Sequence, residues 1–205
     1  MKSIINEKSR LYKLGDICME LFQLNMLFLL SCVPIVTIGG ALIALSETTI
    51  KIHEDTLTKP TITYLRALKA NFWSGLFYFI SLNILVGLIV MEIRLMQFLP
   101  IISFIIVGSA VMFSVIVLLL LISYLFVYRA KYNNTILKSI KVCLQISLLN
   151  IKETLTLILS LCVLLAFSFD ATGFTFLTFF FIFIGFSTIN YFHTKLLLPI
   201  FKNYE

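Results

Sequence analysis

The stretch 24–45, LNMLFLLSCVPIVTIGGALIAL, decides how this chain folds. It begins as an apolar helix, is interrupted by Pro34 and by the pair Gly39-Gly40, and then becomes apolar again. Proline removes a helical hydrogen bond, and glycine lets another backbone come close. Inside a bilayer such a break is tolerated only where protein or a cavity shields the freed backbone groups. The break predicts a tight, buried turn that returns two short helices to the same side of a membrane.

The composition indicates an integral membrane protein. The chain has 205 residues, 60% of them hydrophobic, and a mean hydropathy of +1.04. Soluble domains have an apolar share of about 45–50%. We therefore expect one integral membrane domain over residues 1–205, all-α, in contact with the lipid bilayer. The net charge of +6 is small for a nucleic-acid-binding protein, and the cations flank apolar runs, so no nucleic-acid partner is expected.

The lengths of the apolar runs predict about six membrane-embedded helices. A spanning helix needs about 20 apolar residues, and five runs come near or exceed that length. The piece at 41–45 is expected to be short or re-entrant. The five longer runs lie at 14–33, 72–91, 101–128, 151–169 and 174–198.

Two further segments, 61–72 and 134–150, have the pattern of amphipathic helices. Apolar residues recur at helical spacing, and lysines or arginines lie off that face, which is typical of helices that lie in the membrane interface. Their basic side chains, and those that follow the span at 101–128, are expected to contact either a partner protein or lipid phosphate. These residues are Arg66, Lys69, Arg129, Lys131, Lys138 and Lys141.

The distribution of Lys and Arg predicts the topology. If 24–45 is a hairpin, all sixteen cations except Arg94 face one side of the membrane. If it crosses once, five of the sixteen lie on the opposite side. Cytoplasmic loops are enriched in Lys and Arg, so the hairpin is favoured over five crossings, with both termini cytoplasmic.

No motif for catalysis or cofactor binding is present. The chain lacks G-x-x-x-x-G-K-[ST], H-E-x-x-H and G-x-S-x-G. The run His53-Glu54-Asp55 stands alone in a polar segment and is a weak metal pattern. We expect no enzyme activity, no cofactor and no metal. Three amides fall within apolar runs, Asn25, Asn83 and Asn190, and their commonest use at that depth is hydrogen bonding between helices.

Several short stretches resemble the YesL-like membrane proteins, a family with a domain of unknown function. The family's N-L-L-W resembles Asn25-Met26-Leu27-Phe28, and its P-I-x-T-x-G resembles Pro34-Ile35-Val36-Thr37-Ile38-Gly39. Its K-x-N-F resembles Lys69-Ala70-Asn71-Phe72. Its F-P-L-x-A-R-F resembles the stretch from Tyr124 to Thr135, with Ala130 and Tyr132 in place, Val127 for Pro and Lys131 for Arg. A structural role is expected for Asn25, Pro34, Thr37, Gly39, Gly40 and Ala44.

The resemblance implies a role beside carbohydrate ABC importers in a bacterial cytoplasmic membrane, because genes of this family often lie next to those of such importers. The leading hypothesis is a non-catalytic accessory protein that contacts the permease or ATPase subunits. The alternative is a small stand-alone transporter or channel, which needs a polar path at membrane depth. A third hypothesis, the permease itself, is disfavoured because residues 134–155 lack the E-A-A…G segment of maltose-type permeases.

Overall fold

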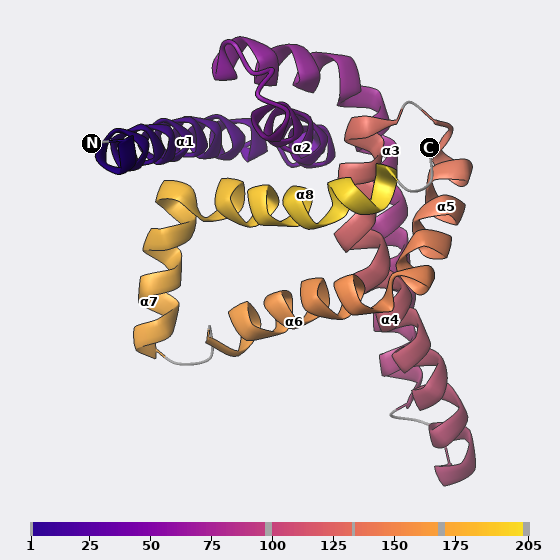
Figure 1. Cartoon of the computed structure of the whole chain (residues 1–205). Coiled ribbons are helices and arrows are strands. Elements are labelled where there is room, and N and C mark those ends of the chain that lie inside the picture. The colour runs from indigo at the N-terminus through magenta and orange to yellow at the C-terminus, as the bar shows by residue number, and fades with distance from the viewer. Residues whose placement is uncertain (1, 97–99, 133, 168–170, 203–205) are drawn as a thin grey trace.

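The computed structural model describes residues 2–96, 100–132, 134–167 and 171–202, and these are helical apart from short connections (Figure 1). The polypeptide is therefore all-α, as its composition predicts. The elements are α1 (Lys2–Cys32), η1 (Ile35–Thr37), α2 (Ile38–His53), α3 (Pro60–Met96), α4 (Ile101–Lys131), α5 (Ile136–Leu149), α6 (Ile151–Phe167), α7 (Ala171–Phe180), the π-helix η2 (Phe181–Gly185) and α8 (Phe186–Lys202).

The first two helices form a hairpin, as expected. Pro34 has an extended backbone and starts the one-turn helix η1, after which α2 begins. The far ends of the hairpin meet, since Lys13 Nζ lies 3.0 Å from Asp55 Oδ1. The turn itself is not buried, which corrects the prediction. No residue of η1 is buried, and Ile35 is 68% exposed, because the close packing begins only at Gly39.

Helix α2 is the central element of the molecule, although the sequence suggested only a short apolar piece at 41–45. It runs 16 residues to His53. The polar residues 46–49 do not end the helix, because the hydroxyl groups among them donate hydrogen bonds to carbonyl oxygens one turn earlier. Ser46 Oγ donates to Leu42 O at 2.9 Å and Thr48 Oγ1 to Ala44 O at 2.7 Å. Hydroxyl groups that bond in this way leave no unpaired donor in an apolar environment.

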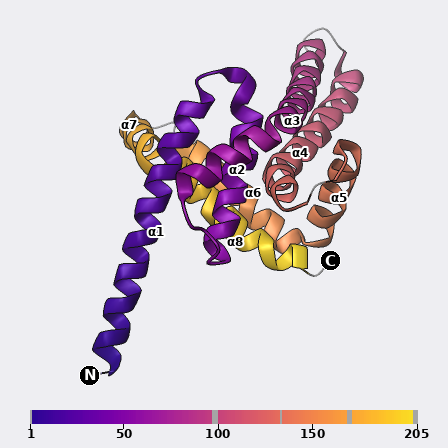
Figure 2. The same cartoon turned by 90° about the horizontal axis from the view of Figure 1, so that it is seen from above.

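Helix α2 also belongs to both hydrophobic clusters of the core. One cluster joins Ile43 and Ile50 to residues of α4, α5 and α8. The other joins Ala44 and Leu45 to residues of α1 and α3. Ala44 is fully buried, in agreement with its expected structural role. Helices α1, α3, α4 and α8 thus pack around α2, and Figure 2 shows the start of α1 extending away from the rest of the molecule.

The segment 61–72 is not a separate amphipathic helix. It forms the first third of α3, which continues without a break to Met96. At about 1.5 Å per residue, 37 residues extend about 55 Å, well beyond the hydrocarbon thickness of about 30 Å. Together α3 and α4 form a long hairpin that projects from the rest of the molecule (Figure 1).

The second amphipathic segment is a separate helix. Helix α5 buries Ser139, Cys143 and Ile146 and exposes Lys138 and Lys141, as its pattern predicts. At Asn150 the chain bends by 100° into α6. The last apolar run is also interrupted, by the π-helix between α7 and α8, and Figure 1 shows these two helices at a large angle. Pro199 lies inside α8 and does not end it.

Candidate functional site

Helices α2 and α3 cross closely at glycines. A Cβ atom built on Gly39 would overlap with the carbonyl group of Gly75, and one built on Gly75 would overlap with the backbone of Gly40. A Cβ on Gly40 would instead lie 3.4 Å from Phe72 Cα, an ordinary contact. The glycine pair therefore brings two backbones together, as expected, but only Gly39 strictly requires the missing side chain.

Thr37 holds the turn that precedes this crossing. Its hydroxyl group lies within hydrogen-bonding reach of the carbonyl oxygens of Ser31 and Pro34, the latter at 2.6 Å. Its backbone N–H also donates to Pro34 O at 3.0 Å. These bonds give partners to Ser31 O, in the last turn of α1, and to Pro34 O, at the start of η1.

Asn25 joins α1 to the π-helix. It is fully buried, and its Nδ2 donates to Phe181 O at 3.0 Å and Ile182 O at 2.8 Å. Its Oδ1 accepts a hydrogen bond from the backbone N–H of Ser187 at 3.2 Å. A π-helix displaces the regular α-helical hydrogen bonds, so a side-chain amide is suited to satisfy the groups that it frees.

A polar seam continues from Asn25 along α8, where that helix packs on α2. Asn190 Nδ2 donates to Ser46 Oγ at 3.0 Å, and Thr49 Oγ1 donates to Asn190 Oδ1 at 2.8 Å. One turn further, His53 Nε2 lies 2.9 Å from Tyr191 O and 3.1 Å from Thr194 Oγ1. The imidazole also stacks on the Tyr191 ring, with centroids 4.1 Å apart. These contacts pair helices with one another.

The three amides of the apolar runs therefore differ in role. Asn25 and Asn190 connect helices, as expected. Asn83 is exposed and donates only to Phe79 O of its own helix, at 2.8 Å. Sequence reasoning missed Gly75, and it also missed His53 as part of the polar seam. The spacing Ser187, Asn190, Thr194 on one face of a helix was the available signal for that seam.

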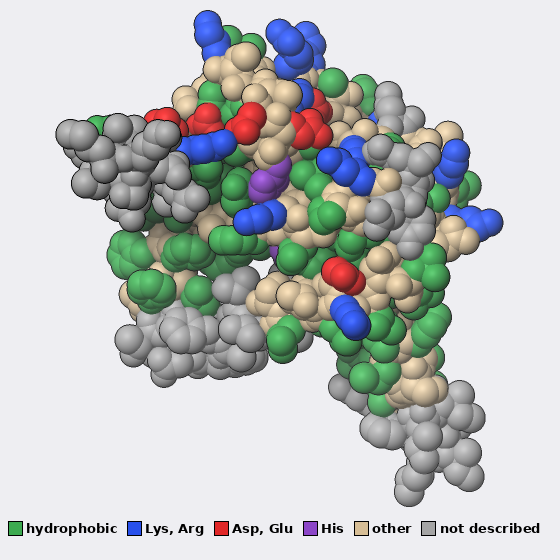
Figure 3. Space-filling model, viewed as in Figure 1, with side chains coloured by type: hydrophobic (Ala, Val, Ile, Leu, Met, Phe, Trp, Pro, Cys, Tyr) green, Lys and Arg blue, Asp and Glu red, His purple; other side chains and the backbone are tan. Residues whose placement is uncertain are grey.

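The six predicted basic contact residues fall into two groups. Arg66 and Lys69 are exposed on the first third of α3, and Figure 3 shows basic side chains gathered along that edge. The other four surround the junction of α4, α5 and the end of α8. There Lys138 and Lys141 are exposed on α5, and Lys131 Nζ lies 5.3 Å from the centre of the Tyr132 ring.

Arg129 points into the molecule at this junction. Its guanidinium group donates to Ser74 Oγ at 2.9 Å, to Asn134 O at 3.2 Å and to Tyr132 O at 3.4 Å. It thereby ties α3 to the connection between α4 and α5. Sequence reasoning placed Arg129 with the exposed contacts, because nothing local indicates that Ser74 lies opposite it.

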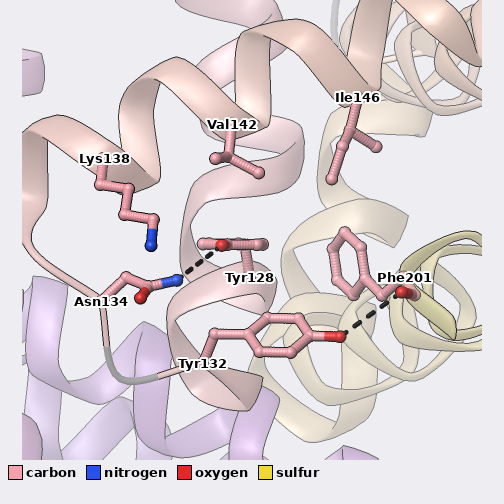
Figure 4. Close-up of a pocket in the computed structure, with 7 residues that line it drawn as sticks. All are labelled: Tyr128, Tyr132, Asn134, Lys138, Val142, Ile146 and Phe201. Carbon is pink, nitrogen blue, oxygen red and sulfur yellow. Dashed lines mark hydrogen bonds between the residues drawn. The ribbon is translucent and has the colours of Figure 1, made fainter. Parts of the chain in front are cut away.

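A pocket of about 420 Å³ opens beside Arg129 (Figure 4). Its floor is an aromatic cluster in which the Tyr128 and Tyr132 rings lie 4.9 Å apart and the Tyr128 and Phe201 rings 5.7 Å apart. Asn134 Nδ2 donates to the Tyr128 hydroxyl oxygen at 2.8 Å, and the Tyr132 hydroxyl to Phe201 O at 3.5 Å. Helix α5 covers the pocket with Lys138, Val142 and Ile146.

These features define a polytopic helical membrane protein. Five helices are long and apolar enough to cross a membrane, or six if the bent pair α5 and α6 forms one span, within the described ranges. The spans found at 15–32 and 35–53 are the hairpin, and the others lie in α3, in α4 and in the stretch from α7 to α8.

Comparison with known proteins finds one family that matches part of this chain. Residues 21–93 match the family DUF624, which is described as a protein of unknown function. The match covers most of the α1–α2 hairpin and nearly all of α3, and so includes Asn25, Pro34 and all three glycines of the crossing. No curated protein and no solved structure matches the chain.

Proposed function

We propose that this protein is a non-catalytic accessory protein of a carbohydrate ABC importer in a bacterial cytoplasmic membrane. The importer context comes from the resemblance of its first third to YesL-like proteins. The observation that carries the proposal is an exposed strip on the first third of α3. Ile62, Arg66, Lys69 and Trp73 recur at helical spacing on this face, and Ile62 is 50% and Trp73 68% exposed.

The chemistry of this strip suits a protein partner. Trp and Arg are enriched where binding energy concentrates in protein interfaces, and aliphatic neighbours help to exclude water around them. Neither Arg66 nor Lys69 forms an ion pair with any residue in the described part of the chain. Their charges are thus available to acidic groups of a permease or an ATPase subunit.

The polar groups between the helices support an accessory role more than transport. Asn25, Asn190 and His53 use their hydrogen-bonding atoms to hold α1 and α2 against α8. Such pairing stabilises helix association at about 0.6–2 kcal/mol per contact. The hydrogen bonds between helices thus account for these polar groups without a transported solute.

The experiment is affinity purification of the tagged full-length protein from its native membrane. We expect permease subunits to co-elute with the wild-type protein and to be lost with R66E/K69E and with W73A. The matched control is K195E/K202E, which reverses two exposed charges on α8. Equal recovery of permease with all variants would refute the strip as the contact, and a wild-type eluate without permease would refute the accessory role.

One observation favours the stand-alone transporter as a second candidate. An open cleft of about 650 Å³ lies between α1 and the start of α3 and is lined by Asp16, Glu20 and Gln23. At this cleft Gln23 Nε2 donates a hydrogen bond to Thr61 Oγ1 at 2.8 Å, which joins α1 to α3. Acidic side chains in a candidate span are a common feature of ion pathways. Proton flux into proteoliposomes that disappears in D16N/E20Q would establish this candidate.

A further inference from the structure

The pocket between α4, α5 and the end of α8 combines two kinds of surface. Hydrogen-bond donors gather at one end, and apolar side chains line the other. Figure 4 shows the Lys138 ammonium group directed toward Asn134 and Tyr128, while Val142 and Ile146 point from α5 toward the aromatic cluster. Tyr128 is 6% and Phe201 1% exposed, so the floor of the pocket is formed by buried aromatic side chains.

Three donors at the polar end have no acceptor among the residues that the structure describes. The Tyr128 hydroxyl oxygen accepts from Asn134 Nδ2, so its own hydrogen remains free to donate. The amide of Asn134 has a second N–H. The ammonium group of Lys138 has no hydrogen bond or ion pair with any residue that the structure describes. A site with three converging donors, one of them charged, is suited to an anion.

The surrounding charge is positive. The stretch 93–152 contains no Asp or Glu, while five of its lysines and arginines follow the span of α4. Two of these, Arg129 and Lys131, flank the aromatic floor. No acidic residue is among the described residues that line the pocket. The local field therefore adds to the preference for an anion and disfavours a cationic group beside it.

We propose that this pocket binds one anionic phospholipid. Its phosphate accepts hydrogen bonds from Lys138, Asn134 and Tyr128, and an acyl chain lies along Val142, Ile146 and Phe201. Basic pockets between membrane helices bind phospholipid head groups in this way. A free phosphate ion would use only the polar end, so the apolar wall distinguishes the lipid from a soluble anion with the same chemistry. This assignment does not depend on the proposed accessory function.

The experiment compares two lysines of α5. Purified full-length protein is titrated with dioleoyl-phosphatidylglycerol or dioleoyl-phosphatidylcholine in detergent, and bound lipid is counted by native mass spectrometry. We expect one retained phosphatidylglycerol per chain. K138Q should weaken its binding at least about tenfold, because a hydrogen bond to a charged group is lost. K141Q removes an equal exposed charge outside the pocket and should bind like the wild type.

V142W, which fills the apolar end, should also lose the lipid. Thermal unfolding shows whether each variant is folded. If V142W does not fold, the comparison of K138Q with K141Q still tests the proposal. Equal losses with K138Q and K141Q would mean diffuse surface attraction and would overturn the proposal. Equal retention of phosphatidylglycerol and phosphatidylcholine by the wild-type protein would also overturn the proposal. Displacement of the lipid by inorganic phosphate at comparable concentration would assign the site to a soluble anion and refute the lipid.

Discussion

At the scale of single residues, the α2–α3 crossing depends on Gly39 and Gly75 and much less on Gly40. G39A and G75A each place a methyl group against backbone that cannot move aside, whereas the methyl group of G40A meets Phe72 at normal contact distance. Overpacking of this kind costs about 1 to 3 kcal/mol. We expect G39A and G75A to lower the thermal unfolding temperature in detergent, with G40A close to wild type. Equal effects of G39A and G40A would contradict the crossing.

The sequence allowed the function of Gly39 to be predicted but not its partner. A glycine pair in an apolar stretch indicates close packing, yet Gly75 has no local feature that links it to residue 39. For Ser46 and Thr48 the local sequence suggested the wrong structure. Hydroxyl residues suggested that the apolar run fades, whereas their bonds to preceding carbonyls let α2 continue. Such bonding depends on the low-polarity surroundings that the rest of the fold supplies.

At the scale of elements, the π-helix η2 depends on a side chain from α1. In N25L the carbonyl groups of Phe181 and Ile182 and the N–H of Ser187 lose their partner at a buried position. An unsatisfied buried polar group costs about 1–3 kcal/mol. We therefore expect N25L to lower the thermal unfolding temperature clearly. N83L is the matched control, since Asn83 is exposed and bonds only within α3. A loss with N83L as large as that with N25L would contradict the role of Asn25.

The elements predicted well are those whose evidence is local. The hairpin follows from Pro34 and the flanking cations, and α5 follows from its periodic pattern. The continuity of α3 through residue 72 was missed because a change from amphipathic to uniformly apolar composition does not by itself end a helix. The sequence singled out Lys138 but did not predict the pocket beside it. Tyr128 and Phe201, which form its floor, are brought together only by the packing of α4 against α8.

At the scale of the whole molecule, the meeting of Lys13 and Asp55 requires both positions to face the same side of the membrane. The charge distribution predicts that this side is the cytoplasmic one. K13C and D55C, each made in a background without the native cysteines, should both be protected from a membrane-impermeant thiol reagent in intact cells. Both should become labelled after permeabilisation. Labelling of only one position in intact cells would mean that the segment between them crosses once.

The same charge distribution predicts that both termini lie in the cytoplasm. Fusions of a reporter that is active only outside the cytoplasm should be inactive at either end of the chain. Activity at the N-terminus alone would instead support the five-crossing arrangement.

The polar seam between α2 and α8 also has a consequence for biosynthesis. Thr49 and Asn190 are 141 residues apart in the chain, and His53 and Thr194 are equally far apart. At about 5–20 residues per second, translation takes roughly 10–30 s to cover that distance. During this interval the central helix is already made while its hydrogen-bonding partners are not. A nascent chain that stops before α8 thus leaves Ser46, Thr49 and His53 of α2 without their partners from α8.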